Sequence, residues 1–251
     1  MLEFKNVTVK KSGKVLIDNI SFSAEKGKIT AIIGKNGSGK STLVGCLSSA
    51  NKYSGSILIE GKDISKLTLR ERARLVAILP QIMPQNDFSI RSLVQLGRNP
   101  YVGGMGILSK EDRLAAENAL EITNMVQFAE RSFSTLSGGE KKRAFIAMLL
   151  AQETPIIVLD EPMAHLDPAS ASEISSLLSH LAKDLGKTLL MVMHELSDAI
   201  ELSHRIALIS GGGLAEFGNS EHFLKNKIIE KYFYLRRFEG TNGEEKRIFF
   251  R

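Results

Sequence analysis

The chain has 251 residues, of which 43% are hydrophobic and 24% are charged, and it contains one cysteine. This composition is typical of a globular protein with a sizeable core, and it excludes a disordered chain, a disulfide scaffold and a cysteine metal cluster. The net charge of +5 permits nucleic acid, a membrane surface or a polyanionic ligand as partner, and it favours none of them. We expect Cys46 to be a small buried hydrophobe in a reducing compartment.

The first third of the chain has the pattern of strands. Alternating apolar and polar side chains at 2–9 and 15–22 predict two half-buried strands, and the short apolar run at 28–34 predicts a fully buried one. A helix at 40–49 and further strands at 54–64 and 75–81 follow. The N-terminal segment does not have the apolar core of a signal peptide, and no apolar run reaches the about 18 to 20 residues that cross a bilayer.

Helical patterns dominate from residue 84 to 153, including a helix for which Ser109 is the expected N-cap. After them, buried strands alternate with helices, which predicts an α/β fold with a mostly parallel sheet and antiparallel N-terminal β arms. Residues 233–251 predict two short strands about a TNG turn. We therefore predict one domain over 1–251, made of a core with β arms (1–83 and 154–232), a helical subdomain (84–153) and a C-terminal β tail (233–251).

A glycine-rich loop, GKNGSGKST, directly follows the buried strand and matches the P-loop pattern. Its glycines let several backbone N–H groups converge on one anion, at the positive end of the next helix. Lys40 would place a charge at the β- and γ-phosphates, and the Ser41 hydroxyl is a hard ligand for Mg²⁺. The predicted ATP-binding residues are Gly34, Lys35, Asn36, Gly37, Ser38, Gly39, Lys40, Ser41 and Thr42. The alternative is a glycine turn with an incidental lysine, which the strand–loop–helix context disfavours.

A second apolar run, IIVL, ends in two adjacent acids. Ligands bind at the carboxyl edge of a parallel sheet, so these acids are placed to act on a nucleotide. We expect Asp160 to hold Mg²⁺, directly or through water, and Glu161 to polarise the water that attacks the γ-phosphate. The alternative is an ordinary solvated strand end without a function. The P-loop earlier in the chain disfavours this alternative.

The segment LSGGE (136–140) opens a long helix with two glycines, which cost roughly 1 kcal/mol each relative to alanine. The segments GKNGSGKST, LPQ, LSGGE, IIVLDEP, HLD and VMHE occur in this order. Over residues 2–225 their order and spacing resemble the nucleotide-binding subunit of an ABC transporter, a P-loop NTPase (RecA-like) fold. In that family two subunits face each other head to tail, and this segment contacts the ATP of the other subunit. The resemblance assigns that contact to Leu136, Ser137, Gly138, Gly139 and Glu140.

The same resemblance implies roles for three further residues. Gln81 would reach Mg²⁺ or the attacking water, and His194, expected to end the strand TLLMVMH, would contact the γ-phosphate. Asp167 would lie at the subunit interface. The implied machinery is a homodimer that hydrolyses ATP with Mg²⁺ held by Ser41, Gln81 and Asp160.

Three positions depart from the family pattern. Glu140 stands where glutamine is more usual, and we expect it on the solvent side of the first helical turn. Lys10 or Lys11 stands near the place of an aromatic residue that often stacks on adenine. Either adenine would bind more weakly, or a lysine stem would supply aliphatic contact in place of stacking. His165 occupies a position usually held by another residue, and the sequence gives no reason for it.

The segment 93–113, which contains GRNPY, resembles importers of iron–siderophore, haem or cobalamin complexes. That resemblance implies a subunit held at the cytoplasmic face of a prokaryotic membrane by integral-membrane permease subunits, with residues about 82–105 receiving a permease helix. An extracellular or periplasmic substrate-binding protein would act indirectly, and no nucleic acid is expected. The alternatives are a soluble ABC ATPase of Fe–S assembly or nucleic-acid repair, and a phosphotransferase kinase that shares the P-loop.

Overall fold

The computed structural model describes residues 1–79, 88–103, 106–242 and 245–251, without the side chains of 241–247. It forms two compact units, one of Met1–Lys66 with Ala182–Arg251 and the other of Leu67–Leu181. In the described part of the chain, no helix is both long enough and apolar enough to cross a membrane.

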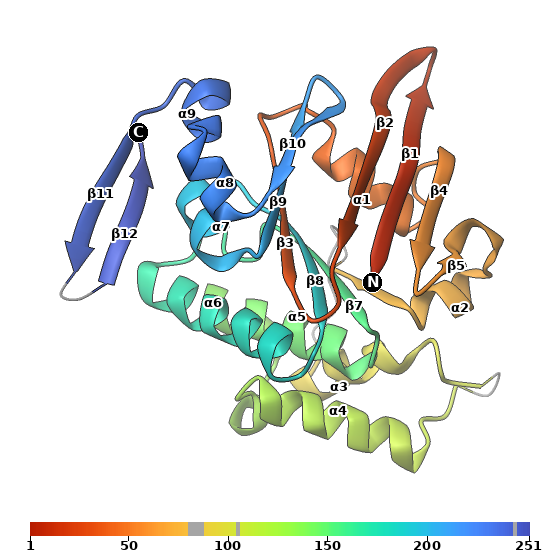
Figure 1. Cartoon of the computed structure of the whole chain (residues 1–251). Coiled ribbons are helices and arrows are strands. Elements are labelled where there is room, and N and C mark those ends of the chain that lie inside the picture. The colour runs from red at the N-terminus through yellow and green to blue at the C-terminus, as the bar shows by residue number, and fades with distance from the viewer. Residues whose placement is uncertain (80–87, 104–105, 243–244) are drawn as a thin grey trace. The chain divides into compact units, whose positions relative to one another are not determined.

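An antiparallel sheet of four strands forms one layer of the first unit (Figure 1). Its strand order is β2-β1-β4-β5, with β1 at Leu2–Lys11, β2 at Lys14–Ala24, β4 at Ser54–Ile59 and β5 at Lys62–Asp63. Most apolar positions that predicted β1 and β2 are buried, and the rings of Phe4 and Phe22 stack 4.7 Å apart among them, whereas Val15 at the start of β2 is exposed. The predicted N-terminal β arms are confirmed.

Parallel strands form the second layer of this unit. Strand β3 (Ile29–Ile33) pairs in parallel with β8 (Thr188–Val192) and β9 (Arg205–Ser210), and β10 (Gly213–Gly218) pairs antiparallel with β9. Every residue of β3 and β8 is buried, as expected for strands that are covered on both faces. Helix α1 (Lys40–Leu47) follows β3, and α7 (Leu196–Leu202) follows β8.

The C-terminal part of the first unit contains two short helices and a hairpin. The helices, α8 (Ser220–Lys225) and α9 (Ile228–Phe233), were not predicted. Strands β11 (Arg237–Asn242) and β12 (Glu245–Phe250) pair antiparallel, which confirms the predicted hairpin. Just beyond the two strands, Arg236 and Arg251 exchange backbone hydrogen bonds of 2.6 and 2.9 Å.

The second unit joins a pair of parallel strands to a group of helices. Strands β6 (Val76–Ile78) and β7 (Ile156–Asp160) pair with Val76 opposite Ile156. The helices are α2 (Leu69–Ala73), α3 (Ile90–Gln95), α4 (Lys110–Ile122), α5 (Gly138–Ala151) and most of α6 (Pro168–Lys183). The predicted strand at 75–81 is shorter than expected, and its residues 80–81 lie outside the described part.

Helix α4 begins where the sequence predicted. Ser109 is its N-cap and accepts the Asp112 N–H at 3.1 Å, while the Asp112 carboxylate accepts the Ser109 N–H at 3.0 Å. Helix α4 ends at Ile122, and Asn124, two residues later, has a left-handed φ of 55°, which does not continue a helix. The GRNPY segment is packed on the end of α5: buried Arg98 donates to Asp112 at 2.9 Å and to the Ala151 carbonyl at 2.7 Å.

Candidate nucleotide-binding and hydrolysis site

The loop 34–42 directly joins β3 to α1 in the first unit. The Lys40 ammonium is buried inside it and donates to the carbonyls of Gly34 at 2.7 Å and Lys35 at 3.2 Å. The charge therefore lies within the loop, where P-loop lysines meet the β- and γ-phosphates. Lys35, Asn36, Gly37 and Ser41 are exposed, while Thr42 is half-buried.

Two loop glycines are required by geometry. Gly34 has a φ of 155°, and a Cβ there would collide with the Ile209 carbonyl oxygen. Gly39 is the left-handed N-cap of α1 and has no side chain to cap it, so the first N–H groups of α1 are left for a ligand. Among the described residues, the buried Ser38 hydroxyl has no hydrogen-bond partner. These features suit an anion with several oxygen acceptors, such as a nucleotide phosphate.

The two predicted acids lie at the end of β7 in the second unit. Asp160 is the last residue of the strand, and both acids are half-buried. Glu161 has a left-handed φ of 51°, which is uncommon for a residue with a side chain. Its carbonyl accepts the Ala164 N–H at 3.2 Å and the Lys142 ammonium at 3.2 Å. The sequence did not single out Lys142.

Lys142 comes from α5 and is itself half-buried. Burial lowers the pKa of Lys142, and the carboxylates of Glu161 and Asp160 offset part of this effect. The chain therefore keeps a cation beside the acid pair, although burying that cation is unfavourable.

Ser137 is the N-cap of α5, and Glu140 closes a capping box with it. The Ser137 Oγ accepts the Glu140 N–H at 3.3 Å, and the Glu140 carboxylate accepts the Ser137 N–H at 2.8 Å. The hydrogen bond from the Ser137 N–H to the carboxylate, with a smaller one from the Ser137 side chain, lowers the pKa of Glu140. Glu140 is half-buried, and closing the helix cap is a role that the sequence analysis did not give it.

The two glycines of the LSGGE segment, which we call the signature segment, have different surroundings. A Cβ on Gly139 would lie 2.7 Å from the Ser170 Oγ and 2.9 Å from its Cβ. A Cβ on Gly138 would meet only the Leu166 Cδ2, at an ordinary 3.6 Å. Gly139 is therefore required by packing within the chain, whereas the described structure leaves room for a methyl group at Gly138.

Asp167 caps helix α6 by accepting hydrogen bonds from Ser170, the residue that lies against Gly139. Its carboxylate accepts the Ser170 N–H at 3.0 Å and the Ser170 hydroxyl at 2.7 Å, and these hydrogen bonds lower the pKa of Asp167. His165, two residues earlier, has a left-handed φ of 62°. Histidine is among the side chains enriched in that conformation, which accounts for its presence in this turn.

The remaining predicted positions are placed as follows. His194 is exposed and lies two residues beyond β8, which ends at Val192, so the expectation that it ends the strand was wrong. Gln81 lies outside the described residues. Lys10 and Lys11 are exposed at the end of β1. Tyr234, which the sequence analysis did not consider, has its ring 4.5 Å from the Lys35 ammonium.

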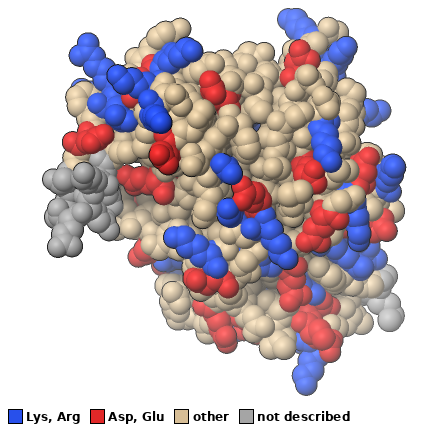
Figure 2. All heavy atoms as spheres, in the orientation of Figure 1, with Lys and Arg blue, Asp and Glu red and all other residues tan. Residues whose placement is uncertain are grey.

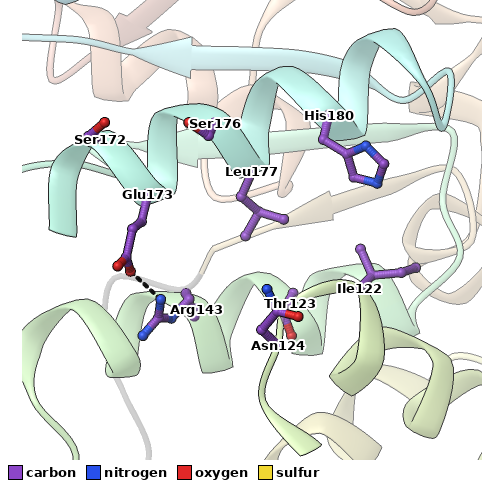
Figure 3. Close-up of a pocket in the computed structure, with 9 residues that line it drawn as sticks. All are labelled: Ile122, Thr123, Asn124, Arg143, Ser172, Glu173, Ser176, Leu177 and His180. Carbon is purple, nitrogen blue, oxygen red and sulfur yellow. Dashed lines mark hydrogen bonds and ion pairs between the residues drawn. The ribbon is translucent and has the colours of Figure 1, made fainter. Parts of the chain in front are cut away.

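A cavity of about 500 Å³ opens in the second unit (Figure 3). An Arg143–Glu173 ion pair joins α5 to α6 beside it. Its lining residues are Ile122, Thr123, Asn124, Arg143, Ser172, Glu173, Ser176, Leu177 and His180. None of them was predicted to bind nucleotide, so the sequence analysis assigns this cavity no role.

Together, the phosphate loop, the acid pair and the glycine-led helix define a P-loop nucleotide-binding protein. A family model described as "ABC transporter" matches residues 17–164, and the chain belongs to this family. The comparisons with solved structures confirm the predicted P-loop α/β fold.

Two curated relatives are similar over most of the chain. The iron(3+)-hydroxamate import ATP-binding protein FhuC of Bacillus subtilis is 38% identical over 224 residues, which cover 88% of this chain and 83% of that protein. The petrobactin import ATP-binding protein YclP of the same species is 37% identical over 235 residues, which cover 93% of this chain and 92% of that protein. The chain thus matches relatives named for different iron chelates.

Two solved structures share the fold. A metal-chelate type ABC transporter in an inward-facing conformation is 25% identical with a TM-score of 0.85, covering 99% of this chain and 96% of that one. The cassette MJ0796, a dimer bound to ADP and phosphate after hydrolysis, is 27% identical with a TM-score of 0.74. The match covers 88% of this chain and 99% of that one.

Proposed function

We propose that the chain is the ATP-hydrolysing subunit of an ABC importer that takes up an iron–siderophore-type chelate through a separate permease. The observation that carries this proposal is the match, over 88% and 93% of the chain, to relatives named as ATP-binding proteins of iron-chelate import. Because these relatives are named for different chelates, the proposal extends to the chelate class and to no single compound.

The active form in this proposal is a homodimer around two ATP molecules, at the cytoplasmic face of the membrane. Each ATP contacts Lys40 and the loop N–H groups of one subunit, and Ser137 with Gly138 of the other. The open approach at Gly138 supports this arrangement. ATP closes the dimer, and hydrolysis removes the contacts that keep it shut.

The chemistry of the predicted metal ligands fits Mg²⁺. The Ser41 hydroxyl is exposed and the Asp160 carboxylate is half-exposed, and both are hard oxygen donors. The described residues contain no cluster of three or more acidic, histidine or cysteine side chains that would cage a metal alone. Mg²⁺ is usually bound by one or two protein groups with substrate phosphates, so Ser41, Asp160 and Gln81 would hold it, and it would neutralise phosphate charge.

Glu161 would act on the attacking water and His194 on the γ-phosphate. The half-buried Glu161 carboxylate follows the strand end, which is where a general base in a parallel sheet is placed. Asp167 would lie at the subunit interface, where its helix cap holds the turn that contains His165. The substrate-binding protein outside the membrane would act only through the permease.

The rival function, a soluble ATPase in Fe–S assembly or nucleic-acid repair, has less support. On the face that Figure 2 shows, Lys and Arg side chains are intermixed with Asp and Glu, whereas nucleic-acid proteins gather their basic side chains in a patch or stripe.

A substitution and an uptake assay test the proposal together. Glu161→Gln should bind ATP normally, form a stable ATP-bound dimer and lose at least about 100-fold in hydrolysis, as expected for a lost general base. Cells of the source organism that lack the chain should lose uptake of radiolabelled ferric siderophore, and the wild-type chain but not this variant should restore it. Unchanged uptake of ferric siderophores in the deletion strain would refute the import function.

A further inference from the structure

We propose that Lys142 is a positioning residue, which holds the backbone of Glu161 from the signature helix and so aims the carboxylate at the attacking water. The inference rests on the proposed role of Glu161 and assigns a role to a residue outside the expected motifs. It concerns groups of the second unit only.

The contact is specific in geometry. The Lys142 Nζ donates to the Glu161 carbonyl oxygen at 3.2 Å, and the Ala164 N–H donates to the same oxygen at 3.2 Å. A carbonyl oxygen has two lone pairs, so the two donors fill its capacity. The peptide group after Glu161 is therefore fixed from both the turn and the helix.

The backbone at Glu161 needs such support. Its φ of 51° is a conformation that a residue with a long side chain rarely adopts, and it persists only when surrounding contacts impose it. The direction of the carboxylate depends on this φ, because the side chain branches from the same Cα. Removing one of the two donors would let the backbone relax and would turn the carboxylate away from its working direction.

The electrostatics favour a lysine over an apolar residue. Lys142 is half-buried, and a buried ammonium without acceptors is unfavourable. Here it lies in the field of two carboxylates, Asp160 and Glu161, and donates to a carbonyl. A residue kept only for packing would be apolar at this position, whereas a charge-assisted donor is the stronger anchor for a strained peptide.

Lys142 also connects two functions along one helix. It lies five residues after Ser137, which in the proposed dimer contacts the ATP of the partner subunit. The next residue, Arg143, pairs with Glu173 of α6, which anchors this turn of α5 (Figure 3). A shift of α5 on binding the partner's nucleotide would thus reach the base that acts on this subunit's own nucleotide.

The test measures phosphate release against ATP concentration for full-length variants. Lys142→Met should lower kcat about tenfold, the effect of one charge-assisted hydrogen bond, and leave KM for ATP within about twofold. Lys142→Arg and Lys142→Gln, which keep a donor, should recover most of the loss. Lys141→Met is the matched control, because that ammonium lies 5.8 Å from the Phe133 ring centroid instead, and it should behave as wild type.

Thermal unfolding of each variant separates positioning from folding, since the inference requires Lys142→Met to unfold within a few degrees of wild type. A wild-type kcat for Lys142→Met, or an equal loss in Lys142→Gln and Lys142→Met, overturns the inference. Glu161→Gln distinguishes the two proposals: normal hydrolysis in that variant would overturn the role of Glu161 itself. If Glu161→Gln is inactive and Lys142→Met is normal, only the role of Lys142 fails.

Discussion

The contrast between the two signature glycines gives a prediction that can be worked out from the structure. In Gly139→Ala the new methyl carbon would lie 2.7 Å from the Ser170 Oγ and 2.9 Å from its Cβ, so α5 or α6 must shift. Overpacking of this kind costs about 1 to 3 kcal/mol, and the helical preference of alanine returns up to about 1 kcal/mol. Gly138→Ala has no such overlap, because its nearest neighbour would be Leu166 Cδ2 at 3.6 Å.

The assay is urea unfolding of the nucleotide-free protein beside its ATP hydrolysis. Gly139→Ala should lose up to about 2 kcal/mol of unfolding free energy, and Gly138→Ala should lose none or gain up to about 1 kcal/mol. Gly138→Ala should nevertheless lose hydrolysis, because its methyl group would occupy the approach of the partner's nucleotide. A Gly138→Ala protein that is less stable than Gly139→Ala, or that hydrolyses ATP at the wild-type rate, would refute this reasoning.

Two further predictions concern ionisable groups. The pKa values of Glu140 and Asp167 are lowered by their helix caps, so their stabilisation is complete above the usual carboxyl pKa and is lost as pH falls through the depressed values. Urea unfolding from about pH 6 to about pH 3 should show this loss, and Glu140→Gln should flatten its share of the slope, since an amide caps without titrating. Burial raises the pKa of Cys46 to about 12, so iodoacetamide should modify it only after unfolding; rapid labelling of the native protein would contradict its burial.

Local patterns were sufficient to predict much of the fold. Strand β3 and the phosphate loop follow from an apolar run that ends in glycines, and the cap of α4 follows from Ser109 three residues before an acid. Helices α8 and α9 were missed because each has only 6 residues, too few for a helical period to stand out.

The details of the site depend on contacts that are distant in sequence. Lys142 and Glu161 are 19 residues apart, and no motif links them. The left-handed backbone at Glu161 cannot be read from an acid that follows a strand, because backbone conformation there is imposed by tertiary contacts. The different needs for glycine at 138 and 139 depend on Ser170, which lies on another helix.

The position of Tyr234 has a practical consequence for work with this protein. Its ring lies on the Lys35 ammonium of the phosphate loop, and Arg236, two residues later, is hydrogen-bonded to Arg251. We therefore expect an affinity tag or fluorescent fusion attached after Arg251 to be tethered close to the phosphate loop and to alter the measured ATP kinetics. Enzymology on this chain should use a tag that is cleaved off before measurement.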